Sequence, residues 1–261
     1  MPEGHTVHRT AKKLQQALGG DPVEVTSPQG RFTDASLVSG QKLIRAEAWG
    51  KQMFLHFEQA AIRIHLGIYG KWGFQKIEDE IPEPRGAVRA RFLGQGFLAD
   101  LRGPTACELI SREDVANYTA KLGPDPLRKD HGDGADFFAA VKKSKRPIGQ
   151  LLMDQSVLAG VGNVYRAEIL FRNRQNPHSP GQSVRDEVLF GIWQDCVDLM
   201  PLGVKTGLML TREGFLKGRP KLEDRYYVYK RHSQSCRECG GQVVMEEMAA
   251  RKLYWCPKCQ E

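Results

Sequence analysis

Long hydrophobic runs, export signals and repeats are all missing from this sequence. No stretch approaches 18 consecutive apolar residues, the length that a membrane-spanning helix needs. The N-terminus lacks a basic flank followed by an apolar core, so it does not indicate a secretion signal. No internal repeat or low-complexity tract occurs. We therefore expect a soluble, cytoplasmic protein that has no membrane partner.

Cysteine is scarce outside the last 26 residues. Six cysteines are present, and only Cys107 and Cys196 lie before Cys236. Cys196 falls on the apolar side of an expected helix, so we interpret it as a small core residue. The short spacing of the remaining four favours a metal site in a reducing compartment over a disulfide framework.

The C-terminal cysteines form two CxxC pairs that are sixteen residues apart. Four thiolates on two tight turns can close a tetrahedron around zinc. No fifth ligand is in view, so the predicted ion is one structural Zn²⁺. Its expected ligands are Cys236, Cys239, Cys256 and Cys259. The segment between the pairs presents Arg251, which is either solvated or a phosphate ligand.

The length of the chain is compatible with two domains, and its net charge is compatible with a polyanionic partner. The chain has 261 residues, 41% of them hydrophobic, which suits a folded protein with a sizeable core. Lys and Arg total 38 against 31 Asp and Glu, a net charge of +7. An excess of this size favours nucleic acid only modestly.

Hydrophobic periodicity changes along the chain. Helical spacing over residues 3–18 ends at Gly19-Gly20, and short strand-like segments follow over 22–101, with a hairpin turn at 94–96. The linker candidate at 121–135 is rich in Pro, Gly and charge. Helices are expected at 136–143, 147–156, 163–173 and 183–200, the last with Ser183 and Asp186 in capping-box positions.

These patterns predict an α+β protein. We expect an N-terminal antiparallel β-sandwich domain with an N-terminal helix at 1–120, the linker at 121–135, a helical domain at 136–230 and a zinc hairpin at 231–261.

Met1-Pro2-Glu3 permits two interpretations. If Met1 is removed, Pro2 carries a free secondary amine that can act as a nucleophile, and Glu3 beside it can exchange protons. The alternative is an ordinary helix start, with Pro in the first turn and an acid near the positive helix end.

A helix pair at 146–171 turns through Gly160 and Gly162. Asn163 then stands at the start of the second helix, where its side chain can cap and free N–H groups can face a phosphate. An ordinary capped helix hairpin is the equal alternative.

Taken together, these motifs resemble the formamidopyrimidine-DNA glycosylase and endonuclease VIII family of base-excision repair enzymes. The resemblance rests on MPEGHTVHR at the N-terminus, WGKQMFLHF at 49–57, HLGIYGKW at 65–72, GPDPL at 123–127, LLMDQSVLAGVGNVYRAEILF at 151–171 and RKLYWCPKCQ at 251–260. It covers essentially the whole chain. It implies a helix–two-turns–helix domain, a zinc hairpin that grips DNA, and a monomer whose partner is damaged DNA.

The resemblance implies a bifunctional DNA glycosylase and AP lyase. Pro2 would form a Schiff base with the sugar, Glu3 would transfer protons, Lys51 would contact phosphate and assist proton transfer, and Arg251 would hold phosphates during β,δ-elimination. The implied DNA contacts are Asn163, Lys121 and the wedge residues Ile68 and Tyr69, which fill the space left by a flipped nucleotide. Glu168 matches a family carboxylate with a structural or orienting role.

The finer specificity stays open. The Ile68-Tyr69-Gly70 loop and the LYWCPKCQ ending favour the endonuclease VIII branch and oxidised pyrimidines, with 8-oxoguanine and formamidopyrimidine as the alternative substrates. Ala249-Ala250 precede Arg251 where many relatives have glycines, which puts the hairpin shape in question. A catalytically silent relative that binds damaged or single-stranded DNA is the rival function.

Overall fold

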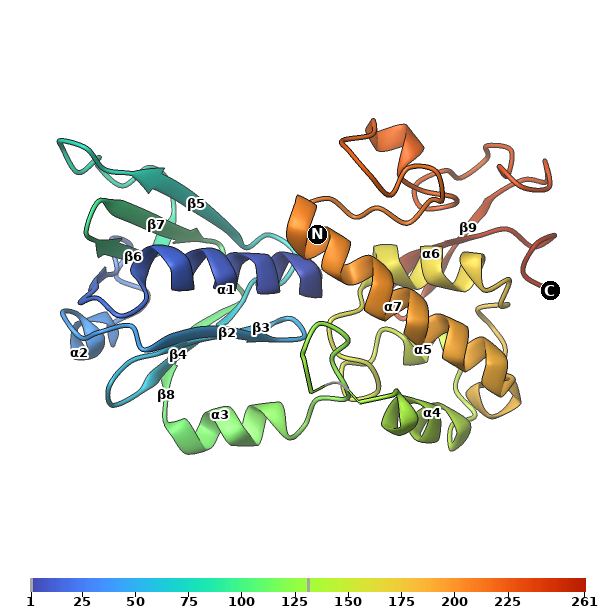
Figure 1. Cartoon of the computed structure of the whole chain (residues 1–261), viewed down its shortest axis with the longest axis horizontal. Coiled ribbons are helices and arrows are strands. Elements are labelled where there is room, and N and C mark those ends of the chain that lie inside the picture. Colours follow the sequence, from blue (N-terminus) through green and yellow to red (C-terminus); the bar gives the residue numbers. More distant parts are fainter. Residues whose placement is uncertain (1, 131) are drawn as a thin grey trace. The chain divides into compact units, whose positions relative to one another are not determined.

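The structure is a computed structural model that describes residues 2–130 and 132–261 (Figure 1). The predicted removal of Met1 therefore lies outside the described residues. The chain divides into two compact units, Met1–Lys121 and Leu122–Glu261, which are described separately. Within the described ranges, no helix is both long enough and apolar enough to cross a membrane.

The first unit begins with helix α1, Gly4–Leu18. Val7, Ala11, Leu14 and Leu18 recur at steps of three and four, and all four are buried, as the periodicity predicts. The helix ends where Gly20 adopts a φ of +89°, a conformation that favours glycine.

Two antiparallel four-stranded sheets form the rest of this unit's framework (Figure 1). The first has the order β1-β6-β7-β5, with bounds Glu24–Thr26, Val88–Gly94, Phe97–Arg102 and Lys71–Lys76. The second has the order β2-β3-β4-β8, with bounds Arg45–Trp49, Gln52–His56, Ala61–His65 and Ala106–Ile110. A short helix, α2, spans Ala35–Val38. The predicted α+β fold class is confirmed, and so is the hairpin at 94–96, which joins β6 to β7.

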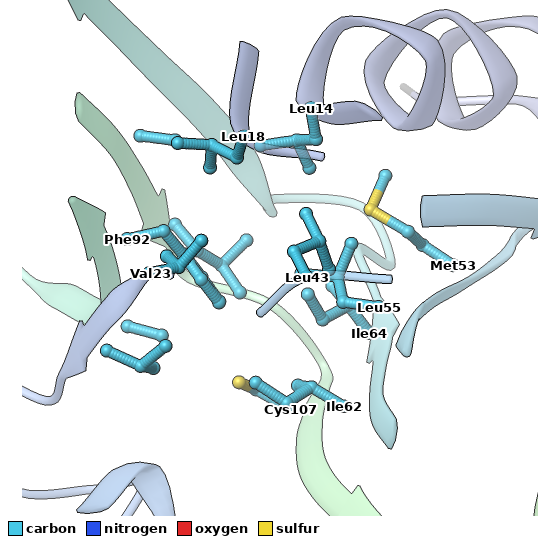
Figure 2. Packing of buried hydrophobic residues seen from close by; sticks show 14 of the residues in the cluster. Leu14, Leu18, Val23, Leu43, Met53, Leu55, Ile62, Ile64, Phe92 and Cys107 are labelled. Atoms are coloured by element: carbon cyan, nitrogen blue, oxygen red, sulfur yellow. The ribbon is translucent and has the colours of Figure 1, made fainter. Parts of the chain in front are cut away.

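The core of this unit lies between its sheets and α1, which contacts strands of both sheets. Figure 2 shows Leu14 and Leu18 of α1 above Phe92 of the first sheet and Leu55 of the second. Both sheets bury alternate side chains here, because successive strand residues face opposite sides. Cys107 belongs to the same cluster, and burial raises the pKa of its thiol to about 12, so it is a core residue.

Helix α3, Arg112–Thr119, was not expected from the sequence. It begins with a capping box in which Ser111 and Asp114 exchange hydrogen bonds, a local signal that lies between the expected strands and the expected linker. Its Val115 packs with Phe54 and Ala61 in a small cluster separate from the main core.

The regular structure of the second unit is mainly helical. It contains α4 Ala135–Lys142, α5 Ile148–Leu151, α6 Asn163–Arg172 and α7 Asp186–Thr206, with 3₁₀ turns η1 Gly181–Ser183 and η2 Leu222–Asp224. A cluster of buried apolar residues, including Phe137, Tyr165 and Cys196, forms its core. The core role expected for Cys196 is confirmed.

Two predicted helix boundaries in this unit are wrong. The helix expected over 147–156 is the single turn α5, since the chain turns at Leu152–Ser156. The expected cap at Ser183 is also absent: α7 begins after Arg185, and the Ser183 hydroxyl instead donates to the Pro180 carbonyl at 2.8 Å. The side chain therefore stabilises η1 rather than α7.

A two-stranded hairpin, β9 Val244–Met248 and β10 Arg251–Trp255, follows near the C-terminus. Met248 pairs with Arg251, so Ala249 and Ala250 form its two-residue turn. The CxxC pairs flank this hairpin in the sequence.

Candidate functional site

Pro2 and Glu3 directly precede α1. Glu3 is the N-cap residue, and its carbonyl accepts from Thr6 N–H at 2.9 Å, but its side chain does not cap the helix. The carboxyl group is completely buried and Pro2 is half-buried. Pro2 lies before the N-cap rather than in the first turn, so the helix-start interpretation is wrong in that detail and does not account for a buried Glu3 side chain.

His5 lies in the first turn of α1, two residues after Glu3. It is 3% exposed, and burial lowers the pKa of its imidazole to about 4, with the positive charges of His8 and Arg9 acting in the same direction. The imidazole is therefore neutral at physiological pH.

Lys51 occupies the turn between β2 and β3. Gly50 supplies the first turn position with a φ of +55°, and Trp49 pairs with Gln52, as in a type II′ hairpin. His65 Nδ1 lies 3.1 Å from the Lys51 carbonyl oxygen. Burial lowers the pKa of His65, and the hydrogen bond to Lys51 partly opposes that effect. His65 was missed because its contact with Lys51 depends on strand pairing between β3 and β4.

Ile68 and Tyr69 form the exposed tip of the turn between β4 and β5. Tyr69 is 83% exposed, and Ile68 is 45% exposed, which is unusual for large apolar side chains. The Gly70 N–H donates to the Leu66 carbonyl at 2.9 Å, and any Cβ at Gly70 would lie 2.3 Å from that oxygen. Glycine is thus required for the turn that presents the tip. Lys121 is exposed at the end of the same unit.

Asn163 is the first residue of α6, and its expected capping role is wrong. Gly162 is the N-cap residue, whereas the Asn163 amide Nδ2 donates to the Lys252 carbonyl at 2.8 Å. Its Oδ1 accepts from Arg166 Nη2. The side chain is buried and fastens the hairpin strand β10 to α6.

Arg251 begins β10 directly after the hairpin turn. Ala249 and Ala250 both have a φ of +54°, as a type I′ turn requires. L-residues other than glycine adopt this conformation at a cost of about 1–2 kcal/mol each. The I′ shape is therefore retained without the glycines that favour it, and surrounding contacts must compensate. Arg251 Nη1 donates to the Ala250 carbonyl at 2.8 Å.

The four C-terminal cysteines converge, with ligand atoms within 4.8 Å of one another. Cys236 Sγ lies 3.8 Å from Cys259 Sγ, and Cys239 Sγ lies 3.5 Å from Cys256 Sγ. Zinc–sulfur bonds of about 2.3 Å give a tetrahedral edge of about 3.8 Å, so the cluster fits one zinc ion.

The cysteine chemistry also fits a metal. A hydrogen bond from the Gly241 N–H lowers the pKa of Cys239 to about 7, whereas burial raises the pKa values of Cys256 and Cys259. A divalent cation deprotonates such thiols outright. The predicted single structural zinc is therefore supported by the donor set.

Three family models match successive parts of the chain. They describe the formamidopyrimidine-DNA glycosylase N-terminal domain at residues 1–106, the H2TH domain of the same enzyme at 122–213, and a zinc finger found in FPG and IleRS at 233–261. Endonuclease 8 1 of Mycobacterium tuberculosis is 46% identical over 269 residues, covering all of both chains. The chain belongs to the formamidopyrimidine-DNA glycosylase and endonuclease VIII family.

Other members of this family show the same coverage. A protein of Mycolicibacterium smegmatis named DNA-(apurinic or apyrimidinic site) lyase Nei2 is 32% identical, covering 100% of this chain and 99% of its own. The Lactococcus lactis Fpg, solved with DNA containing N7-benzyl-Fapy-dG, has a TM-score of 0.84 at 20% identity over the whole of both chains, which shows a shared fold. The predicted family of DNA glycosylases and AP lyases is confirmed.

The predicted residues of this glycosylase-family chain are arranged differently in the two units. Two of them meet in the second unit, whereas several separate elements carry those of the first. Asn163 and Arg251 lie close together, because Asn163 binds the carbonyl of Lys252, the neighbour of Arg251. The first unit carries Pro2, Glu3, Lys51, Ile68, Tyr69 and Lys121 at the start of α1, at two hairpin-like turns and at the unit's end. Arg166, which is not among the residues predicted from the sequence, lies three residues after Asn163 and donates a hydrogen bond to it.

Proposed function

We propose that this chain is a bifunctional DNA glycosylase and AP lyase that excises oxidised bases, pyrimidines in preference to purines. The observation that carries the proposal is Glu3: a completely buried carboxyl group, beside Pro2, that does not cap the helix it precedes. A buried carboxyl group in this position suits proton transfer to and from groups bonded to the Pro2 nitrogen. The alignment with Endonuclease 8 1 over the whole chain supports the same activity.

The first step is nucleophilic attack by the Pro2 nitrogen on C1′ of the damaged nucleotide. A nitrogen–C1′ bond forms, the glycosidic bond breaks, and the base leaves with a proton. The Pro2 N–H proton is lost, the C1′–O4′ bond breaks with protonation of O4′, and the opened sugar is left as an iminium ion. A chain-terminal amine is suited to this role because its pKa lies near neutrality. Glu3 donates and accepts the protons.

Strand cleavage follows because the iminium ion makes the protons on C2′ acidic. A C2′ proton is removed and the 3′ phosphate leaves. A C4′ proton is then removed from the conjugated product and the 5′ phosphate leaves. Lys51 and Arg251 bind phosphate, since both are cations held by hairpin turns. Zinc, when bound, holds the CxxC turns on either side of the hairpin that carries Arg251.

The remaining predicted residues position the DNA. Exposed Ile68 and Tyr69 are proposed to insert where a nucleotide has been flipped out, because apolar wedges replace lost stacking. Asn163 and Lys121 are proposed to contact the backbone phosphates. The side-chain amide of Asn163 is already bonded to Lys252 and Arg166. We therefore propose that Asn163 contributes to phosphate binding through the N-terminus of α6, which its contacts hold in place.

Borohydride trapping tests the function. Protein shown by mass spectrometry to lack Met1 is mixed with duplex DNA containing an abasic site, and a covalent complex is expected. The matched control retains Met1, which makes the Pro2 nitrogen an amide that cannot form the iminium. DNA binding without trapping would support the silent relative, whereas equal trapping with Met1 retained would transfer the nucleophile to a lysine, Lys51 first.

Substrate preference is tested with four oligonucleotides that carry thymine glycol, dihydrouracil, 8-oxoguanine or an abasic site. Faster excision of the two pyrimidines than of 8-oxoguanine is expected. The reverse order would place the chain in the 8-oxoguanine branch while leaving the lyase mechanism intact.

A further inference from the structure

Arg166 is the largest fully buried side chain in the described residues. It lies on α6, one helical turn after Asn163, and its guanidinium donates to three neutral oxygen atoms. These are Asn163 Oδ1, the Met248 carbonyl at 3.2 Å and the Gly149 carbonyl at 3.4 Å. The acceptors come from α6, β9 and α5, so one side chain joins three elements.

The contacts lie on both sides of the hairpin turn. Met248 is the last residue of β9 and Lys252 is the second residue of β10. Arg166 binds the Met248 carbonyl directly, and it binds Asn163, which in turn binds the Lys252 carbonyl. Arg166 and Asn163 together therefore hold both strands at the point where Ala249, Ala250 and Arg251 connect them.

The turn between these contacts is strained. Ala249 and Ala250 both have left-handed backbone conformations that glycine adopts more readily. Nothing in the side chains of two exposed alanines favours this conformation, so the restraint must come from the flanking strands. Close packing supports it, since a Cβ at Gly149 would lie 2.7 Å from Met248 Sδ.

We propose that Arg166 is a positioning residue that holds the strained Ala249-Ala250 turn and thereby fixes Arg251 for phosphate binding. The proposal rests on the proposed function, which assigns Arg251 to the phosphates. Arginine suits the task because its planar fork reaches several acceptors at once, which a lysine ammonium does not.

The test compares Arg166→Lys with Arg172→Lys. Both substitutions keep a positive charge on α6, but the Arg172 guanidinium donates to Asp195 and the Thr211 carbonyl, which lie outside the hairpin. Hydrogen–deuterium exchange of residues 248–252 is expected to accelerate in Arg166→Lys and to stay native in Arg172→Lys. For Arg166→Lys, kcat for cleavage of abasic DNA should fall about tenfold to a hundredfold, since small misplacements have effects of that size.

Rescue separates positioning from general stability. Adding Ala249→Gly and Ala250→Gly to Arg166→Lys should restore most of the lost kcat, because glycine favours the I′ turn without the restraint. The same glycines in the native background should change kcat little. Unchanged exchange and kcat in Arg166→Lys, or a loss that the glycines do not rescue, would overturn the proposal.

Two further measurements keep the outcomes distinct. If Arg166→Lys does not fold, exchange in the unsubstituted protein still decides, because rapid exchange of the N–H groups of Met248 and Arg251, the pair that closes the turn, would itself contradict a restrained turn. If the unsubstituted protein fails to cleave abasic DNA, the proposed function fails, whereas accelerated exchange in Arg166→Lys would still support the restraint of the turn.

Discussion

Glu168 accepts a hydrogen bond of 2.9 Å from the backbone N–H of Val228, sixty residues further along the chain. The same carboxylate accepts from the N–H groups of Tyr227 and Tyr229 and from the Thr211 hydroxyl, at 2.7–2.8 Å. Glu168 is completely buried. Burial raises its pKa, and the four hydrogen bonds act in the opposite direction. The orienting role implied for Glu168 thus has a geometric basis: it fixes both ends of the segment 211–229.

Glu168→Gln should lower the free energy of unfolding by about 2–4 kcal/mol. The amide keeps the size of the side chain, but its NH₂ group faces donors, so two of them lose their acceptor at about 1–3 kcal/mol each. Denaturant titration measures the change. Glu213→Gln, at a side chain that is 74% exposed, is the control and should stay within about 0.5 kcal/mol of the native value. Equal stability of the two variants would show that the buried contacts contribute nothing net.

The stability of the protein should fall as the pH decreases from 6.5 to 4, because of His5. Its pKa is 6.5 in the unfolded chain and about 4 in the folded one, so in this window the unfolded chain binds a proton that the folded one excludes. The contribution is about 3 kcal/mol at its limit below pH 4. Denaturant titrations across this range should show a shallower slope for His5→Gln, while exposed His232→Gln keeps the native slope. An NMR titration that placed the His5 pKa near 6.5 would contradict the prediction.

Zinc removal should abolish DNA binding while the first unit stays folded. Cys256→Ser removes one of four ligands and loosens the hairpin that carries Arg251. The first unit has its own core between two sheets and α1, so its unfolding should be unchanged. We expect loss of bound zinc by atomic absorption and no measurable binding of abasic duplex DNA. Cys196→Ala, at a core position away from the metal ligands, is the control. Native DNA affinity in zinc-free protein would show that the hairpin does not contribute to DNA binding.

Local patterns predicted the elements whose stability is local. The apolar steps of α1, the hairpin at 94–96 and the CxxC pairs each depend on residues a few positions apart, and the structure confirms all three. Helix α3 carried a local signal too, the Ser111–Asp114 capping box, but it lacks an apolar face, since Val115 is its one buried residue in the described chain.

Predictions failed where tertiary contacts competed with local preference. Asn163 has the right chemistry for a helix cap, but its amide gains a partner in Lys252, 89 residues away. Ser183 is a different case, because two local structures compete: its hydroxyl donates to the Pro180 carbonyl three residues earlier, in the 3₁₀ turn η1, and α7 begins at Asp186. A polar side chain forms hydrogen bonds with the partners that the completed fold places beside it. Those distances cannot be read from the sequence.

The sequence by itself determined the family, the division into a sheet-rich and a helical part, the zinc ligands and the candidate nucleophile, because each depends on residue identity and short spacing. Only the tertiary structure decided that Glu3 is buried without capping α1, that Arg166 and Asn163 hold both sides of a strained turn, and that Glu168 closes the segment 211–229. The physical reason is that buried polar groups must be satisfied by whichever partners the completed fold places within hydrogen-bonding distance.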